Sequence, residues 1–372
     1  MQDQGKLDAE VLRSAVRRVA LCRGNDRARV AGRFLRDFMV YHRDLRRLAA
    51  LASAMDCVNL IANDKMRELS SMNNTLYEFQ LPEEQKPAEE RVIHHVVMKA
   101  DIRGSTTLTR TLLERGLNPA SHFTLNFFEP VNKILPIFEA MKVFIEGDAL
   151  ILAMLEREGE PGFGVSRTCV LAREILGIVQ AYNDNSRRAG LPVLELGIGI
   201  CYEDSAPLYL MDGSTRIMIS QALNQSDRLS ACNRLARRVV GENSTSFNVY
   251  AFQTTSENDA DPDEFRVRYN LGGIQLSAGA FQKLSQEISL RLVEIDIPTI
   301  WKSEAARLYA GTAPTPSGGL QSVVVREGRV AVIEPRDLSF KSWSDRKYYE
   351  LCTAPAVYEM VERERAGTMA AR

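Results

Sequence analysis

Apolar positions in the first part of the chain recur at helical spacing. Over residues 7–77 they fall three or four residues apart, as with Phe34 and Phe38, which is the period of one face of an α-helix. The next stretch, residues 81–90, contains two prolines and several glutamates without periodicity, which is typical of a linker or exposed loop. The pattern predicts an N-terminal helical region over residues 1–85.

Short β-branched runs and helical patterns alternate in the next part of the chain, so the expected order is β-α-α-β-β-α-β-α-β. Asn118 and Pro119 are typical of the cap and first turn of the second helix. Gly147 and Asp148 interrupt an apolar run and predict a turn between two strands. The other expected elements are a strand at 92–101, a helix around 171–182, a strand at 193–201, a helix at 223–239 and a strand at 247–252.

Residues 254–266 are acidic and poor in apolar groups, which predicts a second linker. A strand-like VRYNL and a helical pattern at 281–290 follow it. The later run SVVVREGRVAVIE predicts a hairpin that turns at Glu327 and Gly328. The expected organisation is therefore a helical region at 1–85, a domain of alternating strands and helices at 91–255 and a small C-terminal accessory α+β domain at 266–372.

Composition narrows the classes of partner. The 372 residues include 47 Lys and Arg against 48 Asp and Glu, for a formal net charge of -1, so no overall basic field exists to hold nucleic acid or an anionic membrane. The six cysteines have no CxxC spacing, which argues against a zinc site or a disulfide framework. The sequence has no run of about 18 apolar residues, and its polar N-terminal stretch leads us to expect no signal peptide. We expect a cytoplasmic protein with no direct nucleic-acid or membrane partner.

Several common catalytic patterns are missing. The sequence has no GxxxxGK[ST], HExxH or GxSxG, and its two GxG segments lack the last glycine of GxGxxG. Among the four histidines, His94 and His95 are adjacent in an expected strand and therefore point to opposite faces. The simplest interpretation of both is structural.

Two acids remain as candidate metal ligands. Asp101 ends a hydrophobic strand and Asp148 lies in an expected turn, and carboxylates at neighbouring strand ends suit Mg²⁺, which prefers oxygen ligands. The loop with Gly104, Ser105 and Thr106 begins the next helix, where backbone N–H groups are able to bind phosphate. The alternative is that both acids only form turns.

A polar pair on an expected helix is the next candidate. Asn224 and Arg228 are four residues apart and so share one helix face. An amide and a guanidinium projecting together are suited to orient a ribose and to neutralise charge on a transferring phosphoryl group. The alternative is an exposed polar helix face without a ligand.

Taken together and in order, these segments resemble the catalytic domain of class III nucleotidyl cyclases. The resemblance covers about 160 residues of this chain, the size of one domain, and implies a ferredoxin-like βααββαβ fold that works as a head-to-tail homodimer with composite active sites. The matching segments are DIRGST at 101–106, GDA at 147–149, LGIGI at 196–200 and LNQSDRL at 223–229.

The resemblance also implies a role for each residue. Asp101, Asp148 and the carbonyl of Ile102 would bind two divalent cations, Mg²⁺ or Mn²⁺. Asn224 and Arg228 of the other subunit would stabilise the transition state. The ribose 3′-hydroxyl would attack the α-phosphate, giving a 3′,5′-cyclic nucleotide and pyrophosphate.

The expected base pocket departs from the family pattern. Adenylate cyclases carry Lys and Asp, and guanylate cyclases Glu and Cys, where this sequence has Phe144 and Ile217, and neither of these side chains has a polar atom to bind a purine edge. Three explanations stay open: lost chemistry, loose acceptance of purines, or a smaller base.

With a pocket for a smaller base, this sequence resembles the pyrimidine cyclases of bacterial Pycsar anti-phage systems. Residues 269–288 are similar to the accessory domain that follows the cyclase in some of these proteins. The resemblance implies UTP, ahead of CTP, as substrate, and a cyclic UMP or cyclic CMP product that signals infection to a separate effector protein. The alternatives are an adenylate or guanylate cyclase with atypical base contacts and a catalytically silent dimerisation or nucleotide-sensing module.

Overall fold

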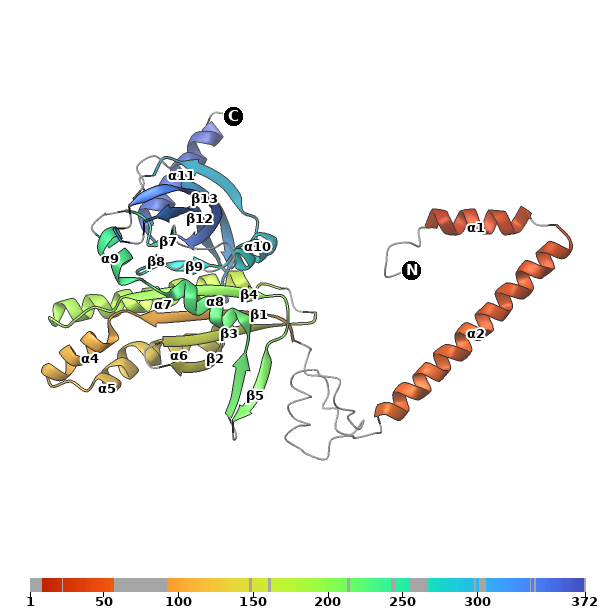
Figure 1. Ribbon diagram of the computed structural model, residues 1–372, viewed down its shortest axis with the longest axis horizontal. Coiled ribbons are helices and arrows are strands. Elements are labelled where there is room, and N and C mark those ends of the chain that lie inside the picture. Colours follow the sequence, from red (N-terminus) through yellow and green to blue (C-terminus); the bar gives the residue numbers. More distant parts are fainter. Residues whose placement is uncertain are drawn as a thin grey trace. The chain divides into compact units, whose positions relative to one another are not determined.

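The protein was analysed as a computed structural model that divides into two compact units, Met1–Glu89 and Glu90–Arg372 (Figure 1). Among the described residues, no helix is long and apolar enough to cross a membrane. The described residues are 9–21, 23–56, 92–146, 149–159, 162–212, 215–241, 245–254, 267–297, 299–300, 306–334, 336–337 and 339–370.

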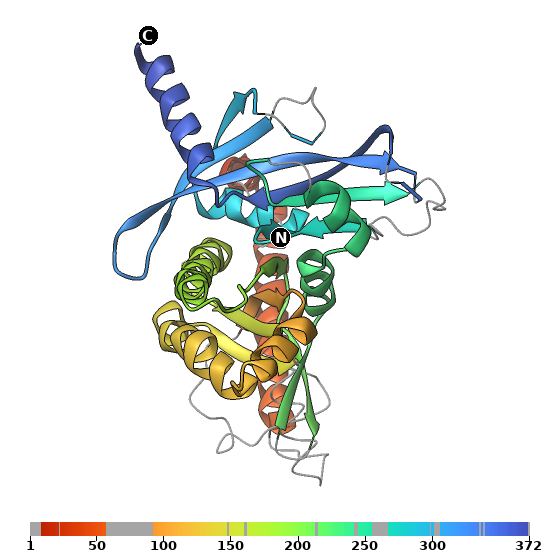
Figure 2. The ribbon, with the colours of Figure 1, turned by 90° about the vertical axis from the view of Figure 1, so that its left-hand side faces the viewer.

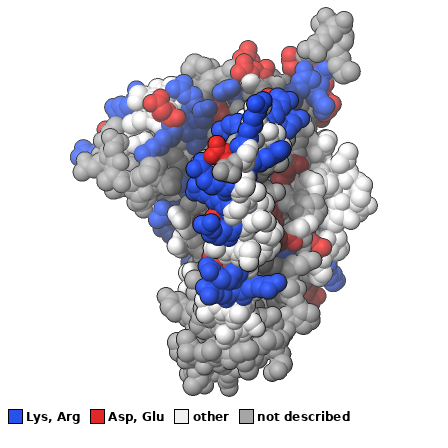
Figure 3. Space-filling model, turned by 90° about the vertical axis from the view of Figure 1, so that its right-hand side faces the viewer, with Lys and Arg blue, Asp and Glu red and all other residues white. Residues whose placement is uncertain are grey.

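The N-terminal unit contains α1 (Ala9–Leu21) and α2 (Asn25–Asp56), which confirms a helical region as far as residue 56. The remainder of the expected region, residues 57–85, lies outside the described residues. On α2, Phe34 and Phe38 are exposed, and their rings stack with centroids 6.0 Å apart. The helix carries more arginines than aspartates. Figure 3 shows a face of the molecule on which Lys and Arg outnumber Asp and Glu.

The second unit begins with a ferredoxin-like arrangement. Its first four strands are ordered β4-β1-β3-β2, with each neighbour antiparallel, which agrees with the ferredoxin-like βααββαβ fold that the resemblance implies. Figure 1 shows the helices that connect these strands. The elements are β1 (Val92–Ile102), α4 (Ser105–Glu114), α5 (Pro119–Phe123), a π-helical turn (Thr124–Phe128), α6 (Glu129–Ile134), a 3₁₀ turn (Leu135–Phe138), β2 (Met141–Glu146), β3 (Ala149–Arg157), α7 (Gly164–Arg188) and β4 (Leu196–Glu203).

The segment after β4 differs from the prediction in two ways. A separate hairpin follows β4, and the single helix expected at 223–239 is wrong because it is two helices. Asn233 explains the break, since its side-chain oxygen accepts hydrogen bonds from the backbone N–H groups of Leu235 (2.8 Å) and Ala236 (3.3 Å) and so begins a new helix. The elements are β5 (Leu208–Asp212), β6 (Thr215–Ile219), α8 (Gln221–Ser230), α9 (Arg234–Gly241) and β7 (Val249–Thr254).

The C-terminal elements extend the same sheet. β9 pairs in parallel with β4 and antiparallel with β13, so the described strands other than β5 and β6 join in one eleven-stranded sheet. In Figure 2 the blue C-terminal strands cross the upper part of this unit, above its orange-to-green elements. The elements are β8 (Val267–Asn270), β9 (Ile274–Leu276), α10 (Ala278–Glu287), β10 (Arg291–Ile295), β11 (Ala306–Pro314), β12 (Leu320–Ile333), β13 (Phe340–Leu351) and α11 (Pro355–Ala370).

This continuity bears on the expected domain boundary. The region from 90 to 372 is one compact unit, and the strand pairing between β4 and β9 joins the two expected domains. The mixed α+β class is therefore confirmed, whereas the division into domains at 91–255 and 266–372 stays a prediction.

The hairpin expected at Glu327 and Gly328 is wrong, because both residues lie inside the continuous strand β12. Gly328 pairs with Tyr348 of β13, and a Cβ at this position would lie 2.3 Å from the Tyr348 ring. The glycine therefore makes room for a buried tyrosine across the strand pair, and it does not form a turn.

The glycines of β4 explain how α8 packs. Leu196, Ile198 and Ile200 are almost fully buried in the large core cluster on one face of the sheet. Gly197 and Gly199 face the other way because side chains alternate along a strand. A Cβ on Gly199 would lie 2.3 Å from the Ser226 carbonyl oxygen, so the missing side chain lets the α8 backbone lie directly on β4.

We predict that Gly199→Ala lowers the free energy of unfolding by about 1–3 kcal/mol, because the new methyl group must displace the α8 backbone. The matched control is Gly177→Ala on the exposed side of α7, where an added Cβ meets nothing within 4 Å. This change should stabilise the helix by about 0.5–1 kcal/mol. Urea unfolding of both variants measures the difference, and equal effects would contradict the packing argument.

Candidate active site on β1 and α8

The two faces of β1 have different surroundings. Val96, Met98 and Ala100 lie in the large core cluster, whereas Val97 packs in a separate cluster with Leu229 of α8. The side chains that alternate with the core residues therefore face α8. They form a mostly polar row consisting of His95, Val97, Lys99 and Asp101.

Asp101 ends this row and forms an ion pair with Arg103. The Arg103 side chain is only 9% exposed and also donates a hydrogen bond to the backbone carbonyl of Asn270, at 3.1 Å. Burial lowers the pKa of Arg103 from its ordinary value, while the Asp101 carboxylate opposes this shift. The guanidinium thus joins the candidate metal ligand to β8.

Asp148, the second expected metal ligand, lies outside the described residues, but its neighbour in the chain does not. Ala149 pairs with Asp101 across β1 and β3, and it pairs with Glu146 across the hairpin. The described residues contain no group of three His, Cys, Asp or Glu side chains arranged to hold a metal. The Asp101 carboxylate and the backbone carbonyl of Ile102 are nevertheless oxygen donors of the kind that Mg²⁺ and Mn²⁺ prefer.

The expected phosphate loop begins α4. Gly104 precedes the helix with φ of 62°, a left-handed conformation that favours glycine. No side chain caps this end of the helix, and its first turn contains no acid. The backbone N–H groups at Ser105 and Thr106 therefore begin a helix end at which an anion is favoured.

Two contacts from the polar row hold α8. The Lys99 ammonium lies 2.6 Å from the Asp227 carboxylate. His95 bonds through Nδ1 to the Ser205 carbonyl and through Nε2 to the Ser220 hydroxyl, both at 2.6 Å. Ser220 in turn accepts from the backbone N–H of Ala222 and begins α8. This arrangement fits a neutral imidazole with its proton on Nδ1, because a carbonyl only accepts.

Asn224 and Arg228 lie on the exposed side of the same helix. Neither side chain makes a hydrogen bond or ion pair with another residue in the described parts of the chain. Arg228 also lines a cavity with Gln225 and with residues of β8, β9, α10 and β13. The two expected transition-state residues therefore share a face that is available to a ligand or to another subunit.

The two expected base-pocket residues are not brought together in the described parts of the chain. Ile217 lies on β6, pairs with Leu210 and is 37% exposed. Phe144 lies on β2 and pairs with Ile151, but its side chain is outside what the structure describes. Their common role in base recognition stays a prediction.

Two positioning residues were missed by the sequence interpretation. Arg103 was included only as part of the segment 101–106, although it pairs with Asp101. Asn270 is fully buried, and its amide donates to the carbonyls of Ile198 (3.1 Å) and Leu229 (2.9 Å). A buried asparagine has no local sequence signal, because its partners lie on other strands and helices.

No protein-family profile and no curated protein sequence matches this chain. Solved structures of class III cyclase domains are similar to it at low identity. The adenylyl cyclase CyaB from P. aeruginosa shares 15% identity over 60% of this chain and 96% of its own, with a TM-score of 0.39. The guanylyl cyclase Cya2 shares 15% over 68% and 99%, with a TM-score of 0.37. The guanylate cyclase domain of RhGC from Catenaria anguillulae, in complex with GTP, shares 14% over 61% and 99%, with a TM-score of 0.36.

We predict that His95 makes stability depend on pH. Burial lowers the pKa of His95 below its ordinary value of 6.5, so the folded state favours the neutral ring and stability is lost as the pH falls below 6.5. In urea unfolding at several pH values, wild type should lose more stability on acidification than His95→Gln does.

Glu287 and Glu350, whose pKa values burial raises to about 6 and about 7, are present in both proteins, so their contributions cancel in this comparison. His42→Gln, at an exposed ring on α2, is the control and should leave the profile unchanged. A His95→Gln profile parallel to that of wild type would contradict the role assigned to this ring.

Proposed function

We propose that this protein is a metal-dependent nucleotidyl cyclase that converts a pyrimidine nucleoside triphosphate, UTP ahead of CTP, to its 3′,5′-cyclic monophosphate and pyrophosphate. The observation that carries the proposal is the strand register at the end of β1. Asp101 pairs with Ala149, which directly follows Asp148 in the chain. Two acids at neighbouring strand ends are the donor set that two divalent cations and a triphosphate require.

The residues around Asp101 support this use of its carboxylate. Arg103 is held by the ion pair and by the Asn270 carbonyl, so it orients the carboxylate from one side. The uncapped start of α4 at Gly104 lies only three residues after Asp101 in the chain. An acid for cations and a helix end for phosphate thus adjoin, as a metal-bound triphosphate requires.

The proposed active site is composite and forms between two copies of the chain. Asn224 and Arg228 have no partners among the described residues, and both are exposed. In a head-to-tail homodimer they would face the Asp101 of the other subunit. There the Asn224 amide would orient the ribose, and the Arg228 guanidinium would neutralise charge that develops on the α-phosphate.

In the proposed reaction, one bond forms and one bond breaks at the α-phosphorus. The ribose 3′-oxygen bonds to the α-phosphorus, the bond from that phosphorus to the bridging oxygen of the β-phosphate breaks, and pyrophosphate leaves. The hydroxyl proton passes to solvent. Two Mg²⁺ or Mn²⁺ ions, held by Asp101, Asp148 and the Ile102 carbonyl, would lower the pKa of that hydroxyl and neutralise the triphosphate.

The choice of a pyrimidine rests on the resemblance and on two apolar side chains. Phe144 and Ile217 stand where purine cyclases of this class carry polar groups, and neither is able to form a hydrogen bond with a base edge. The product's role, as a second messenger to a separate effector in anti-phage defence, also rests on the resemblance. A purine product would favour an adenylate or guanylate cyclase, and no product would favour a catalytically silent module.

The composite site predicts complementation between two inactive variants. Asp101→Asn and Arg228→Ala should each lower turnover by about 100-fold or more, because each removes a charge used in the transition state. When they are mixed one to one and allowed to exchange subunits, about a quarter of the wild-type rate should return, since roughly half of the dimers then have one intact site.

The measurement is turnover with Mn²⁺ and each of ATP, GTP, CTP and UTP, with the products identified by mass. Arg188→Ala, at an exposed arginine near the end of α7, is the control and should keep the wild-type rate. Loss of activity in both variants without recovery on mixing would refute a site shared between subunits.

The base pocket predicts a change in specificity. Phe144→Lys combined with Ile217→Asp should shift the ratio of kcat/KM toward ATP by about tenfold or more, because the new groups supply a donor and an acceptor for adenine. The control is Leu210→Asp, at the residue that pairs with Ile217 on β5. An unaltered ratio in the double variant would mean that positions 144 and 217 do not face the base.

A further inference from the structure

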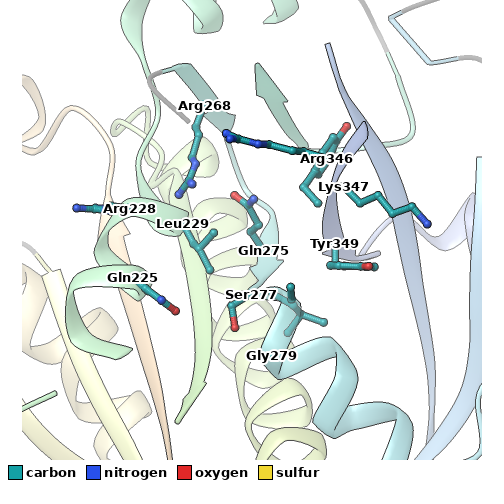
Figure 4. Close-up of a pocket in the computed structure, with 13 residues that line it drawn as sticks. Gln225, Arg228, Leu229, Arg268, Gln275, Ser277, Gly279, Arg346, Lys347 and Tyr349 are labelled. Atoms are coloured by element: carbon teal, nitrogen blue, oxygen red, sulfur yellow. The ribbon is translucent and has the colours of Figure 1, made fainter. Parts of the chain in front are cut away.

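The cavity that Arg228 lines is built mostly from the C-terminal elements. The cavity of about 310 Å³ lies between α8 and residues of β8, β9, β13 and the start of α10. Figure 4 shows Gln275 near its centre, with Arg268 and Arg346 extending over it from either side. Its volume is at the lower end of the range for ligand pockets, which suits one small ligand.

The lining of this cavity is strongly basic. Four cationic residues, Arg228, Arg268, Arg346 and Lys347, line it, and none of its lining residues is acidic. The Lys347 ammonium bonds to Glu327 at 3.0 Å, and the other three residues each carry a guanidinium group. Arg268 is only 7% exposed. Like charges gathered in a half-enclosed space favour an anion, and guanidinium groups bind phosphate with paired hydrogen bonds.

The start of α10 adds to this preference. Ser277, Ala278 and Gly279 line the cavity, and the Ser277 hydroxyl accepts from the backbone N–H of Ala280 at 3.1 Å. The helix is 10 residues long, so its N-terminal end carries a partial positive charge. No side chain projects from Gly279, which leaves the approach to this helix end open.

Gln275 indicates a ligand independently of the basic residues around it. Its side chain is 1% exposed, and its Oε1 atom has no hydrogen-bond partner. A buried acceptor without a partner is costly, and most such groups in native proteins are satisfied. β9 is paired on both sides, which fixes the backbone at Gln275, and the packing around the side chain encloses it almost completely. The ligand therefore carries a hydrogen-bond donor as well as a phosphate.

We propose that this cavity binds a nucleotide. The phosphate groups lie against Arg268, Arg346 and the start of α10, and a ribose hydroxyl or base amino group donates to the Gln275 carbonyl oxygen. The site differs from the proposed catalytic site, since it needs no metal and shares only Arg228 with it. A nucleotide in this cavity would bind the Arg228 guanidinium and thereby regulate turnover. This regulation rests on the proposed function, whereas nucleotide binding does not.

Binding without divalent cations isolates this site. Calorimetric titration of the full chain in EDTA with UTP, CTP, ATP, GTP or pyrophosphate should detect binding of at least one nucleotide, and Asp101→Asn should retain it. Arg346→Gln and Arg268→Gln should each weaken nucleotide binding by about tenfold or more, because a charged hydrogen bond is lost. Arg291→Gln, at an exposed arginine on β10, should bind as wild type does.

Gln275→Met distinguishes a nucleotide from an inorganic anion. The substitution keeps the size of the side chain but removes its acceptor, so nucleotide affinity should fall by about three- to tenfold while pyrophosphate affinity stays the same. Thermal unfolding of each variant checks that it folds. Arg346 is only partly buried, so its variant tests the cavity even where Arg268→Gln fails to fold.

Two results would overturn the proposal: no nucleotide binding in EDTA, or binding that Arg346→Gln leaves unchanged. Binding of pyrophosphate alone would overturn the assignment to a nucleotide. Failure of the proposed cyclase function looks different, because wild type would then lack turnover with Mn²⁺ while nucleotide binding in EDTA persists. An active enzyme without binding in EDTA would keep the cyclase and remove this site.

Discussion

The close approach of α8 to β4 is the contact on which the candidate site depends. Gly199 lets the helix backbone lie on the strand, and a Cβ on Gly197 would lie within 2.1 Å of the Arg103 guanidinium. The same two glycines therefore position the helix that carries Arg228 and leave space for the guanidinium that holds Asp101. A side chain at either glycine would displace α8 or Arg103, and so disturb one of the two surfaces that each chain contributes to the composite site.

The polar row on β1 fixes the position of α8 on the sheet. His95 is bonded to the residue that begins α8, and Lys99 is bonded to Asp227 near its other end. A helix fixed at two points along a central strand has little freedom to slide or turn. Since Asp101 lies on the same strand face, the distance from the acid to the helix is set by the strand itself.

The order of strands and helices along the chain could be predicted because apolar periodicity and turn residues act locally, whereas the ferredoxin-like fold was expected from the resemblance to class III cyclases. The β5–β6 hairpin could also have been predicted, since Asp212 and Gly213 lie between two alternating apolar runs. The role of Gly328 could not be predicted from its neighbours in the chain, because this glycine makes room for the Tyr348 ring on another strand. The bond from Arg103 to Asn270 spans 167 positions, so no local pattern contains it.

The C-terminal elements are part of the site and not an addition to it. β9 covers the edge of β4 at Ile198–Ile200, and Asn270 bonds both to that strand and to the end of α8. The side of α8 that these elements face also borders the basic cavity, through Gln225 and Arg228. One helix thus belongs to both the proposed catalytic site and the proposed nucleotide site. Because a packed helix moves as a unit, a ligand on one side changes the arrangement available on the other.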